Sequence, residues 1–178
     1  MTPEALKALV RTVPDFPAPG IQFRDLTTLM ADGEGLASAV DRLAVCAAGL
    51  GATAVAGIEA RGFIFGAALA VKLGIGFIPM RKAGKLPVPT IAEDYALEYG
   101  TARLECDPVL VRGGENVLLI DDLIATGGTA LAAASLLRRA GAVCSQALFV
   151  IDLPVLGGVQ ALRAVGIESQ ALMTFGGH

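Results

Sequence analysis

From Thr53 onward the chain alternates short apolar runs with helical patterns, and this alternation restricts its fold more than any other feature. The runs expected to be strands cover residues 53–58, 75–80, 116–120, 147–151 and 167–174, and the helical patterns cover 62–73, 128–140 and 154–165. Strands that alternate with helices are typical of a mostly parallel, twisted sheet with helices on both faces, which binds ligands beyond the carboxyl ends of its strands. We therefore predict an α/β fold in a single domain spanning residues 1–178.

Two segments do not follow the alternation. Near the start of the chain we expect a helix that ends before Pro14, and Asp32 is expected to cap a second helix that runs to about Leu50. Residues 81–91 have the composition of a loop. Alternating residues on both sides of Gly100 then predict a hairpin.

Charge and hydropathy argue against two classes of partner. The chain has 14 Lys and Arg residues against 17 Asp and Glu, so it lacks the broad basic surface that neutralises a nucleic-acid backbone. Its mean hydropathy is +0.63, yet its longest charge-free apolar stretch, residues 43–58, is shorter than the ~18–20 residues that span a bilayer. The first residues lack the basic region and continuous apolar core of a secretion signal. We expect a cytoplasmic protein with no nucleic-acid or membrane partner.

The cysteines and the histidine do not suggest a metal centre. Cys46, Cys106 and Cys144 are widely spaced, and His178 is the only histidine of the chain. This spacing predicts neither a zinc site nor a disulfide framework. We expect the cysteines to be small buried residues.

Two adjacent aspartates, Asp121 and Asp122, follow the apolar run at 116–120 and precede a small loop, Thr-Gly-Gly-Thr, at 126–129. At the carboxyl end of a central strand, they would lie where such sheets bind ligands and would point to opposite faces. The loop offers backbone N–H groups and hydroxyls at a helix N-terminus, which favours phosphate. Carboxylates repel phosphate, so we expect Asp121 and Asp122 to bind sugar hydroxyls or a divalent cation attached to the phosphate. The alternative is a solvated turn before a threonine-capped helix.

The loop matches neither of two common nucleotide motifs, because it lacks the lysine of a Walker A element and the chain has no G-x-G-x-x-G. V-L-L-I-D-D-L-I-A-T-G-G-T instead resembles the phosphoribosyl pyrophosphate motif of the type I phosphoribosyltransferases. Four further stretches are similar to the members of that family that act on adenine: F-P-A-P-G-I-Q-F-R-D-L, A-R-G-F-I-F-G, R-K-A-G-K-L-P and Y-A-L-E-Y-G. The resemblance covers almost the whole chain.

This resemblance implies the fold of that family and a purine salvage enzyme. It would transfer the 5-phosphoribosyl group from phosphoribosyl pyrophosphate to adenine, giving AMP and pyrophosphate. The resemblance also implies a homodimer and Mg²⁺ as cofactor, held through pyrophosphate and ribose with no expected protein ligand. Residues 1–32 would form a base-recognition segment, and residues 81–106 would form a mobile loop and hairpin over the site.

The implied phosphoribosyl pyrophosphate site has three parts. Asp121 and Asp122 would bind the ribose hydroxyls. The 5-phosphate would lie in the loop formed by Ala125, Thr126, Gly127, Gly128 and Thr129. The leaving pyrophosphate, whose developing charge cations stabilise, would be bound by Arg61, Arg81, Lys82 and Lys85. From the residues alone, the two lysines are solvated loop residues, whereas Arg61 opens a helix, where an anionic partner is favoured.

The resemblance places Glu98 and Tyr99 on the hairpin that closes over the reaction centre. Glu98 would transfer a proton at the purine ring while the bond between C1 and pyrophosphate breaks. Without the family context, Glu98 is an ordinary exposed glutamate of a strand.

For the base, the resemblance implies two walls and an edge. Phe23 would stack on one face of adenine and Leu153 would cover the other. Backbone groups around Gln22 and Arg24 would read the edge of the ring. The alternative for Phe23 is an ordinary core phenylalanine.

Two positions depart from the family pattern. Ala60 stands where members often have a serine, at a peptide that the family holds in the cis form, and Val88 stands in place of a glycine of the closing loop. A contact through the serine hydroxyl is therefore not expected here.

Two other functions fit parts of the sequence. The Thr-Gly-Gly-Thr loop would serve phosphoribosyltransferases for xanthine, hypoxanthine or orotate equally well, although the stretches at 16–26 and 97–100 favour adenine. A phosphoribosyl pyrophosphate sensor that regulates transcription would share the fold. Such a sensor needs a DNA-binding element or a basic RNA-binding face, and the acidic sequence offers neither.

Overall fold

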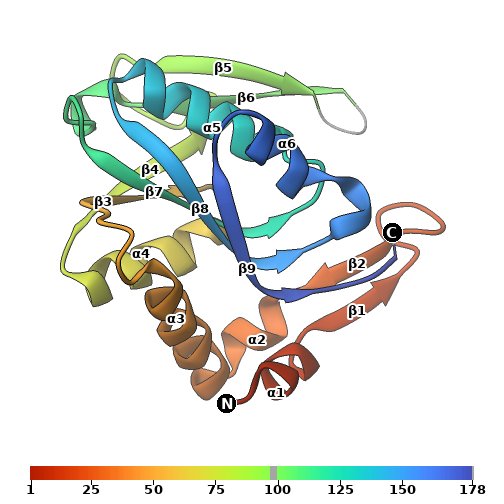
Figure 1. The fold of residues 1–178 in the computed structure, drawn as a ribbon. Helices are drawn as coiled ribbons and strands as arrows, with labels where there is room; N and C mark the ends of the chain where they lie inside the picture. Colours follow the sequence, from red (N-terminus) through yellow and green to blue (C-terminus); the bar gives the residue numbers. More distant parts are fainter. Residues whose placement is uncertain (97–99, 178) are drawn as a thin grey trace.

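The computed structural model describes residues 1–96 and 100–177, and it confirms the predicted α/β fold. Within these residues the main sheet has seven strands in the order β5-β6-β4-β3-β7-β8-β9 (Figure 1). Five of them are parallel: β3 (Ala54–Ile58), β4 (Gly76–Lys82), β7 (Asn116–Ile124), β8 (Val143–Asp152) and β9 (Glu168–Thr174). The antiparallel strands β5 (Ile91–Ala96) and β6 (Thr101–Cys106) extend the sheet from β4, as the predicted hairpin requires.

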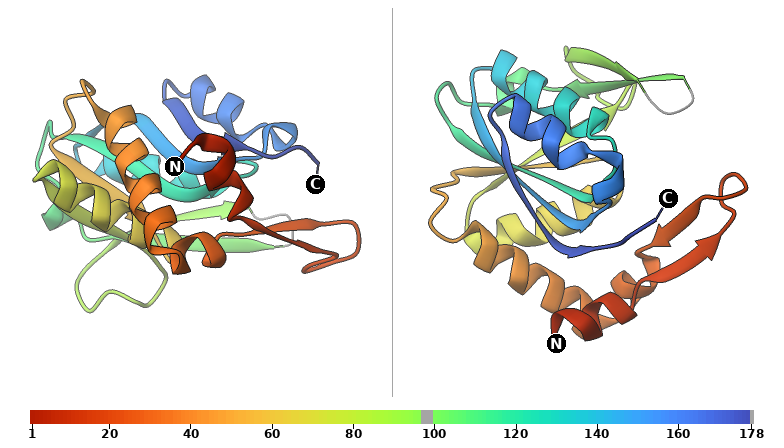
Figure 2. Two further views of the ribbon diagram at one scale, coloured as in Figure 1. Left: turned by 90° about the horizontal axis from the view of Figure 1, so that it is seen from below. Right: turned by 45° about the vertical axis from the view of Figure 1, so that its right-hand side comes forward.

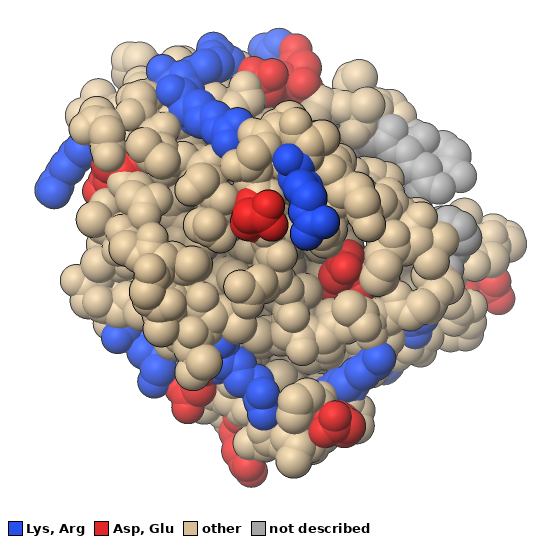
Figure 3. Space-filling model, viewed as in Figure 1, with Lys and Arg blue, Asp and Glu red and all other residues tan. Residues whose placement is uncertain are grey.

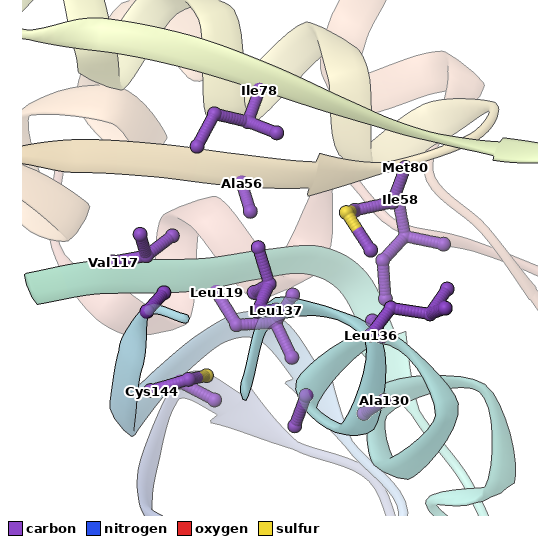
Figure 4. Packing of buried hydrophobic residues seen from close by; sticks show 14 of the residues in the cluster. Ala56, Ile58, Ile78, Met80, Val117, Leu119, Ala130, Leu136, Leu137 and Cys144 are labelled. Atoms are coloured by element: carbon purple, nitrogen blue, oxygen red, sulfur yellow. The ribbon is translucent and has the colours of Figure 1, made fainter. Parts of the chain in front are cut away.

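Helices cover both faces of the sheet. One face carries α3 (Gly33–Ala47) and α4 (Arg61–Leu73), and the other carries α5 (Gly128–Arg139) and α6 (Gly158–Ala164) (Figures 1 and 2). Two short 3-10 helices, Pro108–Leu110 and Pro154–Leu156, lie in connections. Fully buried leucine side chains pack between β7 and α5 (Figure 4), namely Leu119, Leu136 and Leu137. Burying each such side chain stabilises the fold by about 1.5–3 kcal/mol.

Local signals set several boundaries as the sequence predicts. The Asp32 carboxylate accepts a hydrogen bond of 2.7 Å from the backbone N of Gly35 and begins α3. Gly74 ends α4 with φ of 68°, a left-handed conformation that glycine adopts without a Cβ penalty. Every residue of β3 is buried, as expected for a parallel strand covered on both faces.

The N-terminal region differs from the prediction. The helix expected to end just before Pro14 already ends at Ala8 in α1 (Pro3–Ala8), and Arg11–Pro14 is strand β1. This strand pairs antiparallel with β2 (Gln22–Asp25), a segment too irregular to predict, and α2 (Thr27–Ala31) follows. An isolated helix of this length is marginal in water, so the pairing with β2 decides the conformation. Together β1 and β2 form an arm that extends from the body of the molecule (Figure 2).

Strand β7 is longer than predicted. It continues past residue 120 to Ile124, because Leu123 and Ile124 pair with Ile151 and Asp152 of β8. Asp121 and Asp122 therefore lie inside β7, near its carboxyl end, and do not follow it. The helix predicted from Pro154 begins only at Gly158.

None of the helices in residues 1–96 and 100–177 has both the length and the apolar character needed to span a bilayer. On the face shown in Figure 3, basic and acidic side chains are interspersed. All three cysteines are free thiols, and Cys106 and Cys144 are buried as predicted, whereas Cys46 is half-buried. Burial raises the pKa of the Cys106 and Cys144 thiols to about 11.

Candidate active site

A cleft of about 810 Å³ opens beyond the carboxyl ends of β7 and β8, where the fold predicts a ligand site. Its floor is the end of β7 with the loop that leads into α5, and the β1–β2 arm forms one side. The predicted site residues that line it are Gln22, Phe23, Arg24, Arg61, Asp121, Asp122, Ala125, Thr126, Gly127, Gly128, Thr129 and Leu153. A second cleft of about 830 Å³ lies between β5 and α5 and shares Ala96, Thr126 and Gly128 with the first.

The aspartate pair occupies a largely desolvated position at this floor. Asp122 is 6% exposed, and its carboxylate pairs with Arg61 Nε at 2.5 Å. Asp121 Oδ1 accepts a hydrogen bond of 2.8 Å from the backbone N of Asp122. Burial, and then the neighbouring charge of Asp122, raise the pKa of Asp121 well above its usual value. A desolvated carboxyl of this kind favours a hydrogen-bond donor beside it, and a sugar hydroxyl supplies one.

Gly62 explains how α4 approaches the aspartates so closely. A Cβ atom on Gly62 would lie 2.7 Å from Asp121 Oδ1 and 3.1 Å from the carbonyl oxygen of Ile120. Glycine is therefore required after Arg61, and the Ala-Arg-Gly stretch brings the guanidinium to the cleft. The Glu59–Ala60 peptide is cis, as the resemblance implies for this position.

The loop at 125–129 is built for close approach of a ligand. Gly127 has φ of 88°, and a Cβ there would lie 3.1 Å from the backbone of Gly158. Within the described residues no side chain caps α5. Its first N–H groups are therefore available to an anion, which the helix dipole also favours.

Phe23 and Leu153 line the same cleft from different parts of the fold. Phe23 belongs to β2 and packs edge-on against Phe16, with 5.1 Å between ring centroids. Leu153 follows β8, and its backbone N donates a hydrogen bond of 3.0 Å to the carbonyl of Ile124. The Arg61 guanidinium carbon lies 5.9 Å from the centroid of Phe23. An aromatic wall and an aliphatic wall thus flank the space above the carboxylates.

The side chain of Arg24 is engaged away from the cleft. Its guanidinium donates hydrogen bonds to Thr12 Oγ1 and to the carbonyl of Gly176. The predicted role of Arg24 at a base edge concerns its backbone, which these side-chain hydrogen bonds do not use.

Three predicted cations do not line the cleft. Arg81 pairs with the carboxylate of Glu59 at 3.3 Å and donates a hydrogen bond of 3.1 Å to the carbonyl of Lys85. Hydrogen bonding from Arg81 lowers the pKa of Glu59. Lys82 and Lys85 are exposed beside this pair, so these residues form a separate basic turn at the end of β4.

Glu98 and Tyr99 lie outside the described residues, so their predicted roles stay predictions. The neighbouring Ala96 lines the cleft at the end of β5.

Some individual residues of the site were not predicted. The cleft is also lined by residues 18–21, inside the predicted base-recognition segment, and by Leu156. Gly158 contacts the loop at 125–129 from outside the cleft: its backbone N donates to the carbonyl of Ala125 at 3.0 Å, and a Cβ on it would lie 2.4 Å from that oxygen. The Gly157-Gly158 pair at the start of α6 was the available signal for this contact.

Comparison with known proteins agrees with this geometry. The profile of the phosphoribosyl transferase domain family matches residues 25–155. An adenine phosphoribosyltransferase of Erythrobacter litoralis is 67% identical over 178 residues, which cover 100% of both chains. The crystal structure of adenine phosphoribosyltransferase from Thermoanaerobacter pseudethanolicus matches with a TM-score of 0.93 and 40% identity, covering 98% of this chain and 100% of the other. An adenine phosphoribosyltransferase of Giardia lamblia in complex with 9-deazaadenine matches with a TM-score of 0.93 and 32% identity, covering 98% of each chain.

Proposed function

The chain belongs to the phosphoribosyl transferase domain family, and we propose that it transfers the 5-phosphoribosyl group from phosphoribosyl pyrophosphate to adenine. The products are AMP and pyrophosphate, so the reaction salvages a free purine base. One observation carries the proposal: a single cleft combines an anion loop at the start of α5, two carboxylates and a slot with an aromatic wall. Phosphate, ribose and a flat base are the three groups that these features suit.

The parts of the substrate distribute over the cleft as follows. The backbone N–H groups of 125–129 bind the 5-phosphate, and Asp121 and Asp122 accept hydrogen bonds from the ribose hydroxyls. Adenine lies between Phe23 and Leu153. This arrangement holds C1 of the ribose between the base and the pyrophosphate, and such positioning alone lowers the barrier substantially.

In the chemical step the bond from C1 to the pyrophosphate oxygen breaks, and a bond from C1 to a ring nitrogen of adenine forms. Arg61, which lines the cleft, stabilises the charge that develops on pyrophosphate, and the basic turn of Arg81, Lys82 and Lys85 is proposed to contribute. Glu98, with Tyr99 beside it, is proposed to transfer the proton at the purine ring.

Selectivity for adenine follows from hydrogen-bond pairing at the base edge. Adenine offers a 6-amino donor where guanine and hypoxanthine offer a 6-oxo acceptor. Backbone groups around Gln22 and Arg24 that pair with the 6-amino group of adenine are left unpaired when a 6-oxopurine binds. A buried polar group without a partner costs about 1–3 kcal/mol.

Mg²⁺ is proposed as the cofactor. Among residues 1–96 and 100–177 no group of three or more His, Cys, Asp or Glu side chains could hold a metal ion. A hard cation that keeps several waters and binds substrate oxygens fits this cleft, whose lining within the described residues has two carboxylates, Asp121 and Asp122. When bound, it would neutralise charge on pyrophosphate. A homodimer is proposed from the resemblance, and sedimentation analysis would test it. A cytoplasmic location is also proposed.

A base panel tests the proposal. The purified protein is incubated with Mg²⁺, phosphoribosyl pyrophosphate and one base at a time, namely adenine, hypoxanthine, guanine or xanthine, and nucleotide formation is followed. The expected result is AMP from adenine and no product from the others. Turnover of a 6-oxopurine would overturn the base assignment. Tight binding of phosphoribosyl pyrophosphate without any turnover would favour a sensor.

A further inference from the structure

Phe175, in the segment that follows β9, lies between two cations of the N-terminal region. Lys7 Nζ is 4.5 Å and the guanidinium carbon of Arg24 is 4.8 Å from the centroid of its ring. The same two cations also donate hydrogen bonds to the backbone on either side of Phe175. Lys7 donates to the carbonyl of Thr174, and Arg24 donates to the carbonyl of Gly176 at 2.9 Å. Figure 1 shows this end of the chain beside β2. The segment 174–176 therefore ties the β1–β2 arm to the main sheet.

The backbone of Phe175 is anchored on the other side of the cleft. Its N–H donates a hydrogen bond of 3.0 Å to the carbonyl of Asp152, the last residue of β8. Asp152 directly precedes Leu153, which forms one wall of the base slot. On its ring side, Phe175 holds Arg24, which directly follows Phe23, the other wall. One residue thus connects the immediate neighbours of both walls.

We propose that Phe175 is a positioning residue that sets the spacing between Phe23 and Leu153, and hence the fit of the base. The inference rests on the proposed function, since it concerns the slot assigned to adenine. Its physical basis is that the arm is joined to the sheet at this point by ring–cation and hydrogen-bond contacts, whose loss lets β2 shift relative to β8. A stacked base is sensitive to such a shift. The aspartates lie on β7 and the phosphate loop connects β7 to α5, so neither is affected.

The competing explanation is that Phe175 only fills the apolar cluster under α1 and α3, of which it is a partly buried member. Phe175→Leu separates the two explanations, because leucine keeps apolar bulk and removes the ring that carries Arg24. Phe175→Tyr restores the ring. Lys7→Met is the matched control, since it removes the other cation on the same ring and leaves Arg24 in place.

The experiment measures KM for adenine, KM for phosphoribosyl pyrophosphate, kcat and Tm for the unaltered protein and these three variants. We expect Phe175→Leu to raise KM for adenine about threefold to tenfold, with KM for phosphoribosyl pyrophosphate and kcat at saturation unchanged. Phe175→Tyr should restore KM for adenine, and Lys7→Met should leave it unchanged.

Three results would overturn the inference while leaving the proposed function intact. They are an unchanged KM for adenine in Phe175→Leu, an equal rise in both KM values, and an equal rise in KM for adenine in Lys7→Met. A purely structural role would appear as a lower Tm with all kinetic constants retained. Failure of the unaltered protein to form AMP would instead overturn the proposed function, and this inference with it.

Discussion

Arg61 of α4 and Asp122 of β7 form an ion pair inside the cleft, with 2.5 Å between Nε and a carboxylate oxygen. The Asp122 side chain is 9% exposed and that of Arg61 is 42% exposed. Arg61, which is proposed to bind pyrophosphate, is thus paired with Asp122, which is proposed to bind ribose. Because the carboxylate is buried, removing either partner should affect the other.

Substitutions at this pair should therefore be coupled. We expect Asp122→Asn to weaken phosphoribosyl pyrophosphate binding, because the amide replaces a carboxylate acceptor for the ribose hydroxyl, and Arg61→Gln to lower kcat. A double-mutant cycle on kcat/KM should yield a coupling free energy of about 0.5–3 kcal/mol. The control is Arg163→Gln, which removes an exposed ion pair with Glu168. This variant should keep the kcat/KM of the unaltered protein. Strict additivity would show that the ion pair has no role in the reaction.

Glu98→Gln should lower kcat more than it changes either KM, because the amide keeps the shape of the side chain and cannot transfer the proton. Glu93→Gln is the matched control, since Glu93 lies on β5 and pairs with Arg139 outside the proposed chemistry. Steady-state kinetics at saturating substrates would provide the comparison. An unchanged kcat in Glu98→Gln would remove this residue from the mechanism.

Gly158→Ala should disturb the phosphate loop from outside the cleft. Its Cβ would lie 2.4 Å from the carbonyl oxygen of Ala125 and 3.0 Å from the backbone N of Gly127, so the loop must move. We expect at least about a tenfold higher KM for phosphoribosyl pyrophosphate with a smaller change in KM for adenine. Gly76→Ala, where a Cβ meets open space, is the control. Equal kinetics for the two variants would contradict the assigned role of the loop.

Asp25 predicts a pH dependence of stability. Hydrogen bonds from Thr27, and then from Arg11, lower the pKa of Asp25 from 3.8 to about 2. Since the folded-state pKa is below the unfolded value, this contribution is fully present above about pH 4 and is lost as the pH falls toward 2. Asp25→Asn should reduce the free energy of unfolding by about 1–3 kcal/mol at pH 7.

Denaturant unfolding at pH 7 and at pH 2.5 tests this effect. The difference between the unaltered protein and Asp25→Asn should shrink at pH 2.5, because this pH lies below the ordinary pKa of 3.8 and the carboxyl is then protonated in the unfolded chain. A difference that stays constant between the two pH values would show that the carboxylate charge does not contribute.

Features set by residues close together in the sequence were predicted, and features set by distant contacts were not. The alternation from β3 to β9 and the pairing of Asp121 and Asp122 with a glycine loop are local patterns, and they were predictable. Strand β1 was not, because its four residues form a strand only by pairing with β2. The end of β7 was placed too early, since its last residues are held by β8.

The site shows the same dependence on distant contacts. Local motifs identified the residues that line the cleft from β2, α4, β7 and the phosphate loop. The support that Gly158 lends to Ala125, and the contacts of Phe175 with Lys7 and Arg24, join residues far apart in the sequence. No local pattern signals such contacts, so only the folded chain reveals them.

A crystal structure of the protein with bound AMP would test the proposed site most directly. We expect the phosphate to accept hydrogen bonds from the backbone N–H groups of 125–129 and the ribose hydroxyls to donate to Asp121 and Asp122. We expect the adenine ring to lie between Phe23 and Leu153. AMP bound in the cleft between β5 and α5, or with its base outside the slot, would contradict the proposed site.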